Sequence, residues 1–139
     1  MTWLTWALLS AAFAAATAIL AKLGVRDLDS NLATAIRTSV VVVFTWLFAC
    51  STWQSSALAA ISATTWMFLG LSGLATGLSW ICYFHALKLG PASRVAPIDK
   101  LSVALVIVFA ALFLGERLTP AKGVGGLLIV AGAIVIALE

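Results

Sequence analysis

Charged residues are scarce in this 139-residue chain, since Asp, Glu, Lys and Arg make up 9% of it while apolar residues make up 63%. A soluble domain carries roughly a quarter charged residues. The mean hydropathy of +1.15 is accordingly that of a membrane protein. This deficit of charge excludes a water-soluble globular fold and indicates a chain that is surrounded by lipid.

The sequence also lacks the groupings that chemistry at a metal or active site requires. Cys50 and Cys82 lie in apolar runs without zinc-ligand spacing, so we expect no metal, no cofactor and no structural disulfide. The basic residues stand singly rather than in a patch, which argues against a nucleic-acid partner. No nucleophile, base and acid and no paired carboxylates fall at one depth, so we expect no enzyme.

What the sequence does have is a series of apolar runs long enough to cross a bilayer, each of about 20 residues. Charged or polar segments and the Gly90-Pro91 pair separate these runs. The sequence therefore predicts an all-α membrane protein, with five transmembrane helices in a single domain over residues 1–139. The five predicted spans are Trp3–Ala21, Leu32–Cys50, Trp66–Ala86, Val95–Gly115 and Pro120–Leu138.

Charges between the spans predict the orientation of the chain. An odd number of spans puts the two ends of the chain on opposite sides. The side opposite the amino terminus carries four cations, against two on the amino-terminal side, which predicts a cytoplasmic carboxyl terminus in a bacterial inner (plasma) membrane. Because four against two is a small margin, insertion in both orientations stays open. Five tryptophans form an aromatic belt near the amino-terminal side: Trp3, Trp6, Trp46, Trp53 and Trp66.

Hydroxyl side chains recur at helical spacing on the second and third predicted spans, and the third adds a glycine stripe about a third of a turn away. One interpretation is a cavity-lining face beside a close-packing face. The other is that each hydroxyl bonds to its own helix. The cavity candidates are Thr34, Thr38, Ser72, Thr76, Ser79 and Tyr83, and the glycine stripe is Gly70, Gly73 and Gly77.

Charges inside the spans are costly and are therefore functional candidates. Arg37 lies in the second predicted span, and Asp99 and Lys100 follow Pro97 in the fourth. Because neighbours on a helix do not face each other, we expect Asp99 and Lys100 to have separate partners, with Arg37 a partner for Asp99. Snorkelling of the basic side chains to the interface is the alternative.

These charges and two aromatic residues also bear on the substrate. Arg37 or Lys100 would favour a carboxylate on it, and Trp80 and Tyr83 would offer aromatic contact. His85 points away from the hydroxyl stripe by helical phase, so we interpret it as a packed or interfacial residue rather than a proton relay.

Small residues mark the last predicted span as an oligomer contact. Gly125 and Gly132 are seven residues apart and share one face, where a second helix can approach closely. Close packing within the same subunit is the alternative. Glu116 and Arg117, at the short turn before this span, are expected to position the turn rather than to take part in transport.

Three motifs of the chain stand out: Ala-Leu-Lys-Leu-Gly-Pro-Ala-Ser-Arg-Val-Ala-Pro-Ile-Asp-Lys-Leu-Ser from Ala86, Leu-Phe-Leu-Gly-Glu-Arg-Leu-Thr, and Lys-Leu-Gly at residues 22–24. Together they resemble the EamA-type domain of the drug/metabolite transporter superfamily. The resemblance implies half of a ten-helix fold in which two five-helix repeats of opposite orientation surround a substrate cavity. It further implies a homodimer, antiparallel in arrangement, or a heterodimer with a related half.

The glycine-notched last span is also similar to the dimer-forming helix of small multidrug resistance proteins. Those relatives exchange protons through a glutamate in the first span, and this chain has no carboxylate there. We therefore expect no proton-coupled drug efflux by that route. The predicted function is secondary transport of small metabolites or organic solutes by alternating access, with lipid and a small-molecule substrate as further partners. The alternative is a non-transporting accessory or assembly subunit paired with a related transporter half.

Overall fold

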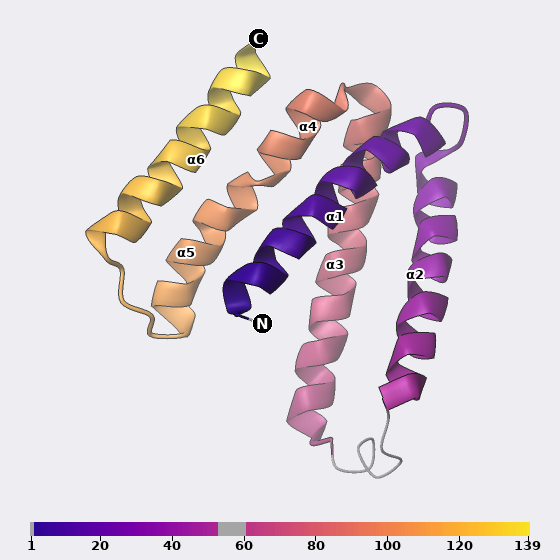
Figure 1. Ribbon diagram of the computed structural model, residues 1–139, viewed down its shortest axis with the longest axis horizontal. Helices are drawn as coiled ribbons and strands as arrows, with labels where there is room; N and C mark the ends of the chain where they lie inside the picture. The colour runs from indigo at the N-terminus through magenta and orange to yellow at the C-terminus, as the bar shows by residue number, and fades with distance from the viewer. Residues whose placement is uncertain (1, 53–60) are drawn as a thin grey trace. The chain divides into compact units, whose positions relative to one another are not determined.

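A computed structural model describes residues 2–52 and 61–139. Helices account for most of this part of the chain (Figure 1). They are α1 (Trp3–Gly24), α2 (Ser30–Thr52), α3 (Ala63–Leu89), α4 (Ala92–Asp99), α5 (Leu101–Phe113) and α6 (Pro120–Leu138). Together α4 and α5 form one span, so the described residues contain five segments long and apolar enough to cross a membrane. The predicted five-span, all-α fold is confirmed.

The second and third spans extend beyond the apolar runs because polar residues cap them. The Asp29 carboxylate accepts hydrogen bonds from the backbone amides of Asn31 (3.0 Å) and Leu32 (3.1 Å), so α2 begins at Ser30. The hydroxyl of Ser62, the residue before α3, accepts a hydrogen bond from the backbone amide of Thr65 at 3.2 Å. An apolar window therefore underestimates helices that continue into the polar interface.

The fourth span is broken, which corrects the single helix predicted over residues 95–115. Pro97 has no amide hydrogen and its ring disturbs the preceding turn. The amide of Lys100 donates to the Pro97 carbonyl at 3.1 Å, and the amide of Val103 donates to the Lys100 carbonyl at 3.0 Å. These bonds span three residues rather than four, so the backbone tightens at Lys100 and divides the span into α4 and α5.

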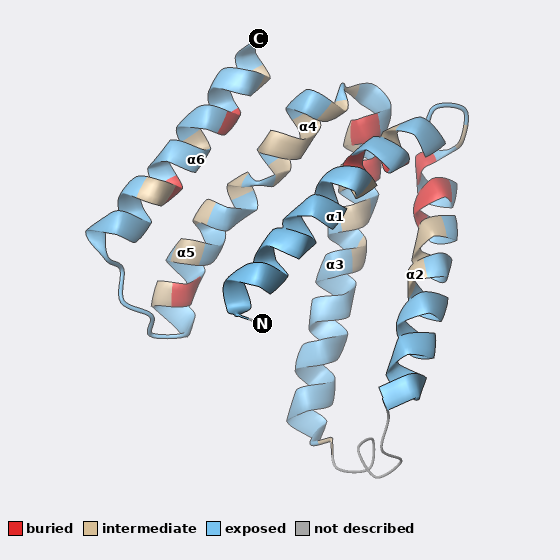
Figure 2. Ribbon diagram, viewed as in Figure 1, coloured by how far each residue is buried: buried red, intermediate tan, exposed pale blue. Residues whose placement is uncertain are grey.

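The chain divides into two compact units: the hairpin unit, residues 24–88, and the split unit, residues 1–23 and 89–139. In the hairpin unit α2 and α3 run antiparallel. Its buried residues gather where the turn at 25–29 meets the end of α3, and Figure 2 shows this as red segments on those helices. Val25, Phe84 and Leu87 are almost fully buried there.

In the split unit, α6 packs against α4 and α5 through small residues. Gly126 is buried, and a Cβ added to it would lie 3.3 Å from Cδ1 of Ile107. Ala133, seven residues further along the same face, is also buried. At the other end of this unit, Nζ of Lys22 donates to the Gly90 carbonyl at 2.8 Å and ties α1 to the turn before α4.

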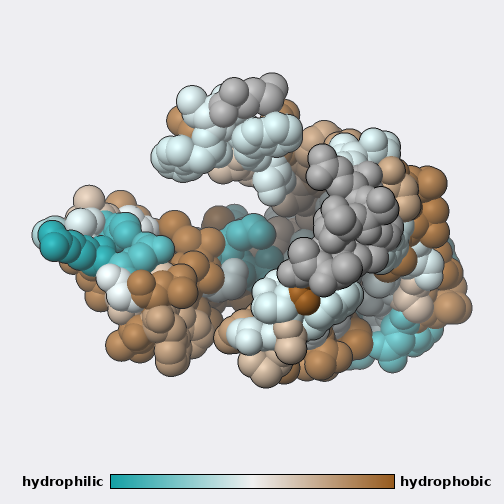
Figure 3. All heavy atoms as spheres, turned by 90° about the horizontal axis from the view of Figure 1, so that it is seen from below, coloured by the Kyte–Doolittle hydropathy of each residue, from teal (hydrophilic) through white to brown (hydrophobic). Residues whose placement is uncertain are grey.

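Most large apolar side chains lie on the outside of the helices. Phe13, Phe44 and Leu78 are exposed, and Figure 3 shows hydrophobic side chains over much of the visible flanks. Such a surface suits contact with lipid or with other membrane helices. The tryptophans at positions 3, 6, 46 and 66 are exposed near helix ends, as an aromatic belt requires, whereas Trp53 lies outside the described residues.

Candidate functional site

The most distinctive polar feature of the hairpin unit is Arg37 of α2 against two aromatic rings of α3. Its guanidinium carbon lies 4.3 Å from the centroid of the Trp80 ring and 5.6 Å from that of Phe84. Both distances are within the range of cation–π attraction. Arg37 is half-buried and stands seven residues into α2, about 10 Å along the helix axis. The structure thus holds a cation within a membrane-spanning segment.

No carboxylate neutralises Arg37 among the residues that the structure describes. The salt bridges there join Lys100 to Asp99 and Lys122 to Glu116. The hydrogen bonds of the described residues likewise leave the guanidinium N–H groups without an acceptor. Stacking occupies the face of a guanidinium and leaves its in-plane donors available, so this geometry can bind an anion.

Two of the predicted cavity residues flank Arg37, and their hydroxyls bond within their own helix. Thr34 donates to the Ser30 carbonyl at 2.7 Å, and Thr38 donates to the Thr34 carbonyl at 2.7 Å. Thr34 is buried and Thr38 is half-buried. The alternative interpretation of the hydroxyl stripe therefore holds for these donors, although each oxygen retains a lone pair that can accept a hydrogen bond.

The base of the hairpin unit is fixed by two further contacts. The Ser30 hydroxyl lies 3.2 Å from Nδ1 of His85, and Nζ of Lys88 donates to the Leu28 carbonyl at 2.9 Å. Both contacts join the start of α2 to the end of α3. They tie the two helices together at the end of the hairpin that carries Arg37 and Trp80, and His85 is an exposed residue bonded to Ser30.

The hydroxyl stripe on α3 lies largely on the exposed surface of that helix. Ser72, Thr76 and Ser79 are exposed, and Thr76 donates to the Ser72 carbonyl at 2.8 Å. Tyr83 is half-buried. The structure thus brings Thr34, Thr38 and Trp80 together around Arg37 and leaves these three hydroxyls outside that group. Their place in a substrate cavity stays a prediction.

The glycines of α3 do not serve close packing among the described residues. A Cβ added to Gly70, Gly73 or Gly77 would meet nothing within 4 Å. Within the hairpin unit this stripe therefore has no packing partner. Its close-packing role stays a prediction for a helix outside that unit.

Asp99 and Lys100 pair with each other, which corrects the expectation of separate partners. Nζ of Lys100 lies 3.2 Å from Oδ2 of Asp99. The general rule for helix neighbours fails here because the backbone leaves the helical path at Lys100, and its long side chain folds back. The Ser102 hydroxyl donates to the Asp99 carbonyl at 2.8 Å and supports the same break.

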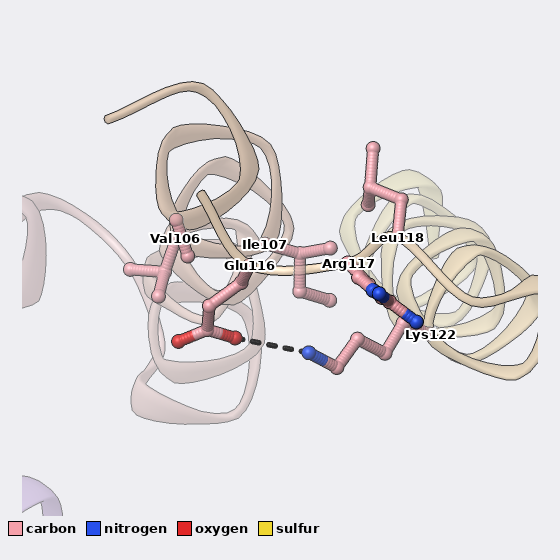
Figure 4. A pocket seen from close by; sticks show the side chains of 7 residues that line it. Val106, Ile107, Glu116, Arg117, Leu118 and Lys122 are labelled. Atoms are coloured by element: carbon pink, nitrogen blue, oxygen red, sulfur yellow. Dashed lines mark hydrogen bonds and ion pairs between the residues drawn. The ribbon is translucent and has the colours of Figure 1, made fainter. Parts of the chain in front are cut away.

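A small pocket lies in the split unit beside the turn between α5 and α6. Its volume is about 160 Å³. Figure 4 shows Glu116 and Lys122 pointing toward each other across it, with Nζ of Lys122 2.9 Å from Oε2 of Glu116. Gly115 makes the turn possible, since its φ of +66° is a conformation that glycine adopts easily. Glu116 therefore positions the turn as predicted, with Lys122 as its partner.

The predicted dimer contact on α6 remains open in the split unit. The internal packing uses Gly126 and Ala133, each one residue beyond the predicted pair. Gly132 is exposed, Gly125 is half-buried, and a Cβ on either would meet nothing within 4 Å. Within the split unit Gly132 therefore has no packing neighbour. The oligomer contact and close packing within the same subunit both stay predictions.

Phe84 is the part of the Arg37 site that sequence reasoning missed. It stands four residues after Trp80, and residues at that spacing share a helix face. A signal was therefore present in the sequence. Which ring of α3 faces Arg37 depends on the register of the hairpin, and no periodicity in either helix gives that register.

Comparison with known proteins identifies the family. Residues 1–138 match the model of the EamA-like transporter family. A protein from a Sinorhizobium species, described as an uncharacterized transporter in the cobO 3′ region, is 52% identical over 136 residues. That match covers 98% of this chain and 96% of the relative. No solved structure matches. The chain is thus an integral, multi-pass membrane protein and belongs to the EamA-like transporter family.

Proposed function

We propose that this protein is a secondary transporter that moves small organic solutes by alternating access. The broken fourth span carries the proposal. Pro97 leaves one helical hydrogen bond unmade and the backbone tightens at Lys100. Irregular backbone at membrane depth occurs where protein or a water-filled path surrounds it. In carriers built from repeats, such breaks lie at the substrate path. Here the break carries Asp99 and Lys100, a pair of charges that a lipid-facing helix has no use for.

Polar groups on α2 and α3 supply the rest of the path. We propose that Arg37, Thr34 and Thr38 line it from α2, and that the α3 stripe of Ser72, Thr76, Ser79 and Tyr83 lines it from the facing repeat or subunit. Intramembrane cations and hydroxyls are favourable only beside water, substrate or another polar group. Trp80 connects the two sets of residues, because its ring contacts Arg37 of α2 and it lies on α3, the helix that carries the hydroxyl stripe.

We propose that the functional unit is a dimer. The described residues supply five spans, which correspond to one repeat, and an inverted-repeat carrier encloses its substrate between two repeats. We propose that two copies pair through the Gly125 and Gly132 face of α6, in an antiparallel homodimer. A heterodimer with a related half is the other arrangement that the one-repeat length allows.

The orientation in a bacterial inner membrane follows the charge distribution. We propose that the ends carrying Lys22, Arg26, Lys88 and Arg94 face the cytoplasm. The four-to-two margin is small enough for a fraction of chains to insert the other way. That property is compatible with an antiparallel homodimer.

Flux into sealed vesicles tests the carrier directly. The purified chain is reconstituted into liposomes, and currents or tracer uptake are recorded after concentration jumps of amino acids, organic acids, sugars and organic amines. A carrier gives protein-dependent flux of at least one class, accelerated when the same solute is present on the opposite side. Absence of flux for every class, together with co-purification of a related transporter half, would instead establish an accessory subunit.

A further inference from the structure

The two candidate anion-binding cations, Arg37 and Lys100, differ in whether a carboxylate of the described residues pairs with them. Lys100 has its charge neutralised by Asp99 at 3.2 Å. Arg37 has no carboxylate partner among the described residues and lies against the rings of Trp80 and Phe84. An unneutralised cation within a span requires a compensating anion, or water, at some stage of the working cycle. Arg37 rather than Lys100 is therefore the residue poised to receive a negative charge.

The aromatic contacts determine how that charge is received. The central carbon of the guanidinium lies over the Trp80 ring, 4.3 Å from its centroid. This contact uses none of the N–H donors as hydrogen bonds, and two such donors match the two oxygens of a carboxylate in a bidentate pair. Phe84, at 5.6 Å, restricts the same group from a second ring. The cation is oriented before any ligand arrives, which lowers the entropic cost of binding.

One cation limits the charge of the ligand. A monocarboxylate paired with Arg37 is neutral as a complex, whereas a phosphate dianion would leave one uncompensated charge inside the span. The surrounding helix faces are rich in apolar and aromatic side chains, which favours a ligand with an apolar body. We propose that Arg37 is the carboxylate-binding residue of this protein, and that its substrate is a small organic monocarboxylate.

This inference rests on the proposed carrier function, but the binding of the anion can be observed without transport. The chain contains four arginines, so the Nε–Hε signals of Arg26, Arg37, Arg94 and Arg117 in the ¹⁵N-labelled full-length protein form a set with internal controls. The probes are benzoate, its neutral analogue benzamide, and inorganic phosphate. The signal that disappears in Arg37→Lys identifies Arg37.

The expected result is a saturable shift of the Arg37 signal with benzoate, while the other three arginines move little and benzamide has no effect. Arg37→Lys keeps the positive charge but loses the paired N–H donors of the guanidinium. Trp80→Leu keeps the arginine but removes the ring that restricts the orientation of its guanidinium. Each should weaken benzoate binding by about tenfold or more, measured by calorimetry, whereas Arg26→Gln should bind as the wild type does. Arg26 is an exposed residue of the turn and serves as the matched charge control.

Several outcomes would overturn the proposal. The proposal fails if benzoate shifts the Arg37 signal no further than the Arg26 signal, or if benzamide shifts the Arg37 signal as far as benzoate does. A stronger response to phosphate than to benzoate would overturn the monocarboxylate class. Benzoate binding at Arg37 without flux of any solute would support the carboxylate site and contradict the proposed transport function. Flux of a neutral solute that survives Arg37→Gln would refute the site and keep the carrier.

Discussion

Nζ of Lys22, in the last turn of α1, donates a hydrogen bond to the carbonyl of Gly90, 68 residues away, at 2.8 Å. The acceptor lies in the Gly90-Pro91 turn that starts the broken span, since Pro91 is the residue before α4. The contact shows how a cation near the membrane interface can serve the fold. The Lys22 ammonium need not only extend toward water, because it also donates a hydrogen bond to a carbonyl in a turn.

Loss of this contact should destabilise the split unit. Lys22→Met keeps the aliphatic stem of the side chain and removes the donor. We expect the free energy of unfolding in detergent to fall by about 1 kcal/mol, because a charged donor bonded to a carbonyl is replaced by none. Arg94→Met is the matched control, since Arg94 is an exposed cation near the same turn. Equal melting temperatures for the two variants would show that the contact contributes nothing.

The break in the fourth span should be needed for transport but not for stability. Pro97→Ala restores an amide hydrogen and relieves the ring clash, so the fused helix should be more stable by about 1 to 3 kcal/mol. If the break is a joint of the transport cycle, flux should fall by roughly tenfold or more. Thermal unfolding and vesicle uptake on the same preparation measure both. A variant that is more stable and equally active would show that transport does not require the break in the fourth span.

The open face of α6 should hold the dimer together. Gly132→Leu adds a large side chain where the described residues leave open space, so the subunit should fold normally and fail to pair. Gly123→Leu is the matched control, because Gly123 is also exposed and unobstructed but lies on the opposite side of the helix. Light scattering in detergent should give half the wild-type protein mass for Gly132→Leu and the full mass for Gly123→Leu. The reverse pattern would place the interface elsewhere.

Acid should weaken the start of α2. The backbone amide of Leu32 holds the pKa of Asp29 below its ordinary value of 3.8, with smaller help from Asn31 and from the positive charges of Lys88 and His85. Because the folded-state pKa is lowered, the stabilisation is present above the unfolded-state pKa and is lost as the pH falls through the folded-state value. Asp29→Asn should therefore reduce the loss of melting temperature between pH 6 and pH 3. Asp27→Asn should leave that loss unchanged.

The spans could be predicted from the sequence because lipid imposes a length and an apolar composition on every crossing helix. The pairing of charges could not. Asp99 and Lys100 bond to each other because Pro97 disturbs the backbone, and the rule for an intact helix predicts the opposite. The ring that receives Arg37 depends on the hairpin register. The two helices are tied together by Ser30 with His85 and by Lys88 with Leu28, which are contacts between residues 55 and 60 positions apart.

The two glycine stripes also show what spacing in the sequence does not predict, namely the packing partner of a helix face. Spacing places Gly125 and Gly132 on one face, and within the split unit a Cβ added to either would meet nothing within 4 Å. The same holds for Gly70, Gly73 and Gly77 in the hairpin unit, although a close-packing role was predicted for them. A stripe of small residues shows that a helix can be approached closely. Whether the approaching helix belongs to the same chain depends on packing that the stripe itself does not encode.

The most direct test of the carrier is whether water reaches the α3 hydroxyl stripe inside the membrane. Ser79→Cys and Ile81→Cys, each in a background with Cys50 and Cys82 replaced by Ala, place a thiol at nearly the same depth on opposite faces of α3. A membrane-impermeant maleimide applied to sealed vesicles should label Ser79→Cys from either side and leave Ile81→Cys unlabelled. Equal labelling of both positions, or of neither, would contradict a water-accessible transport path along this face.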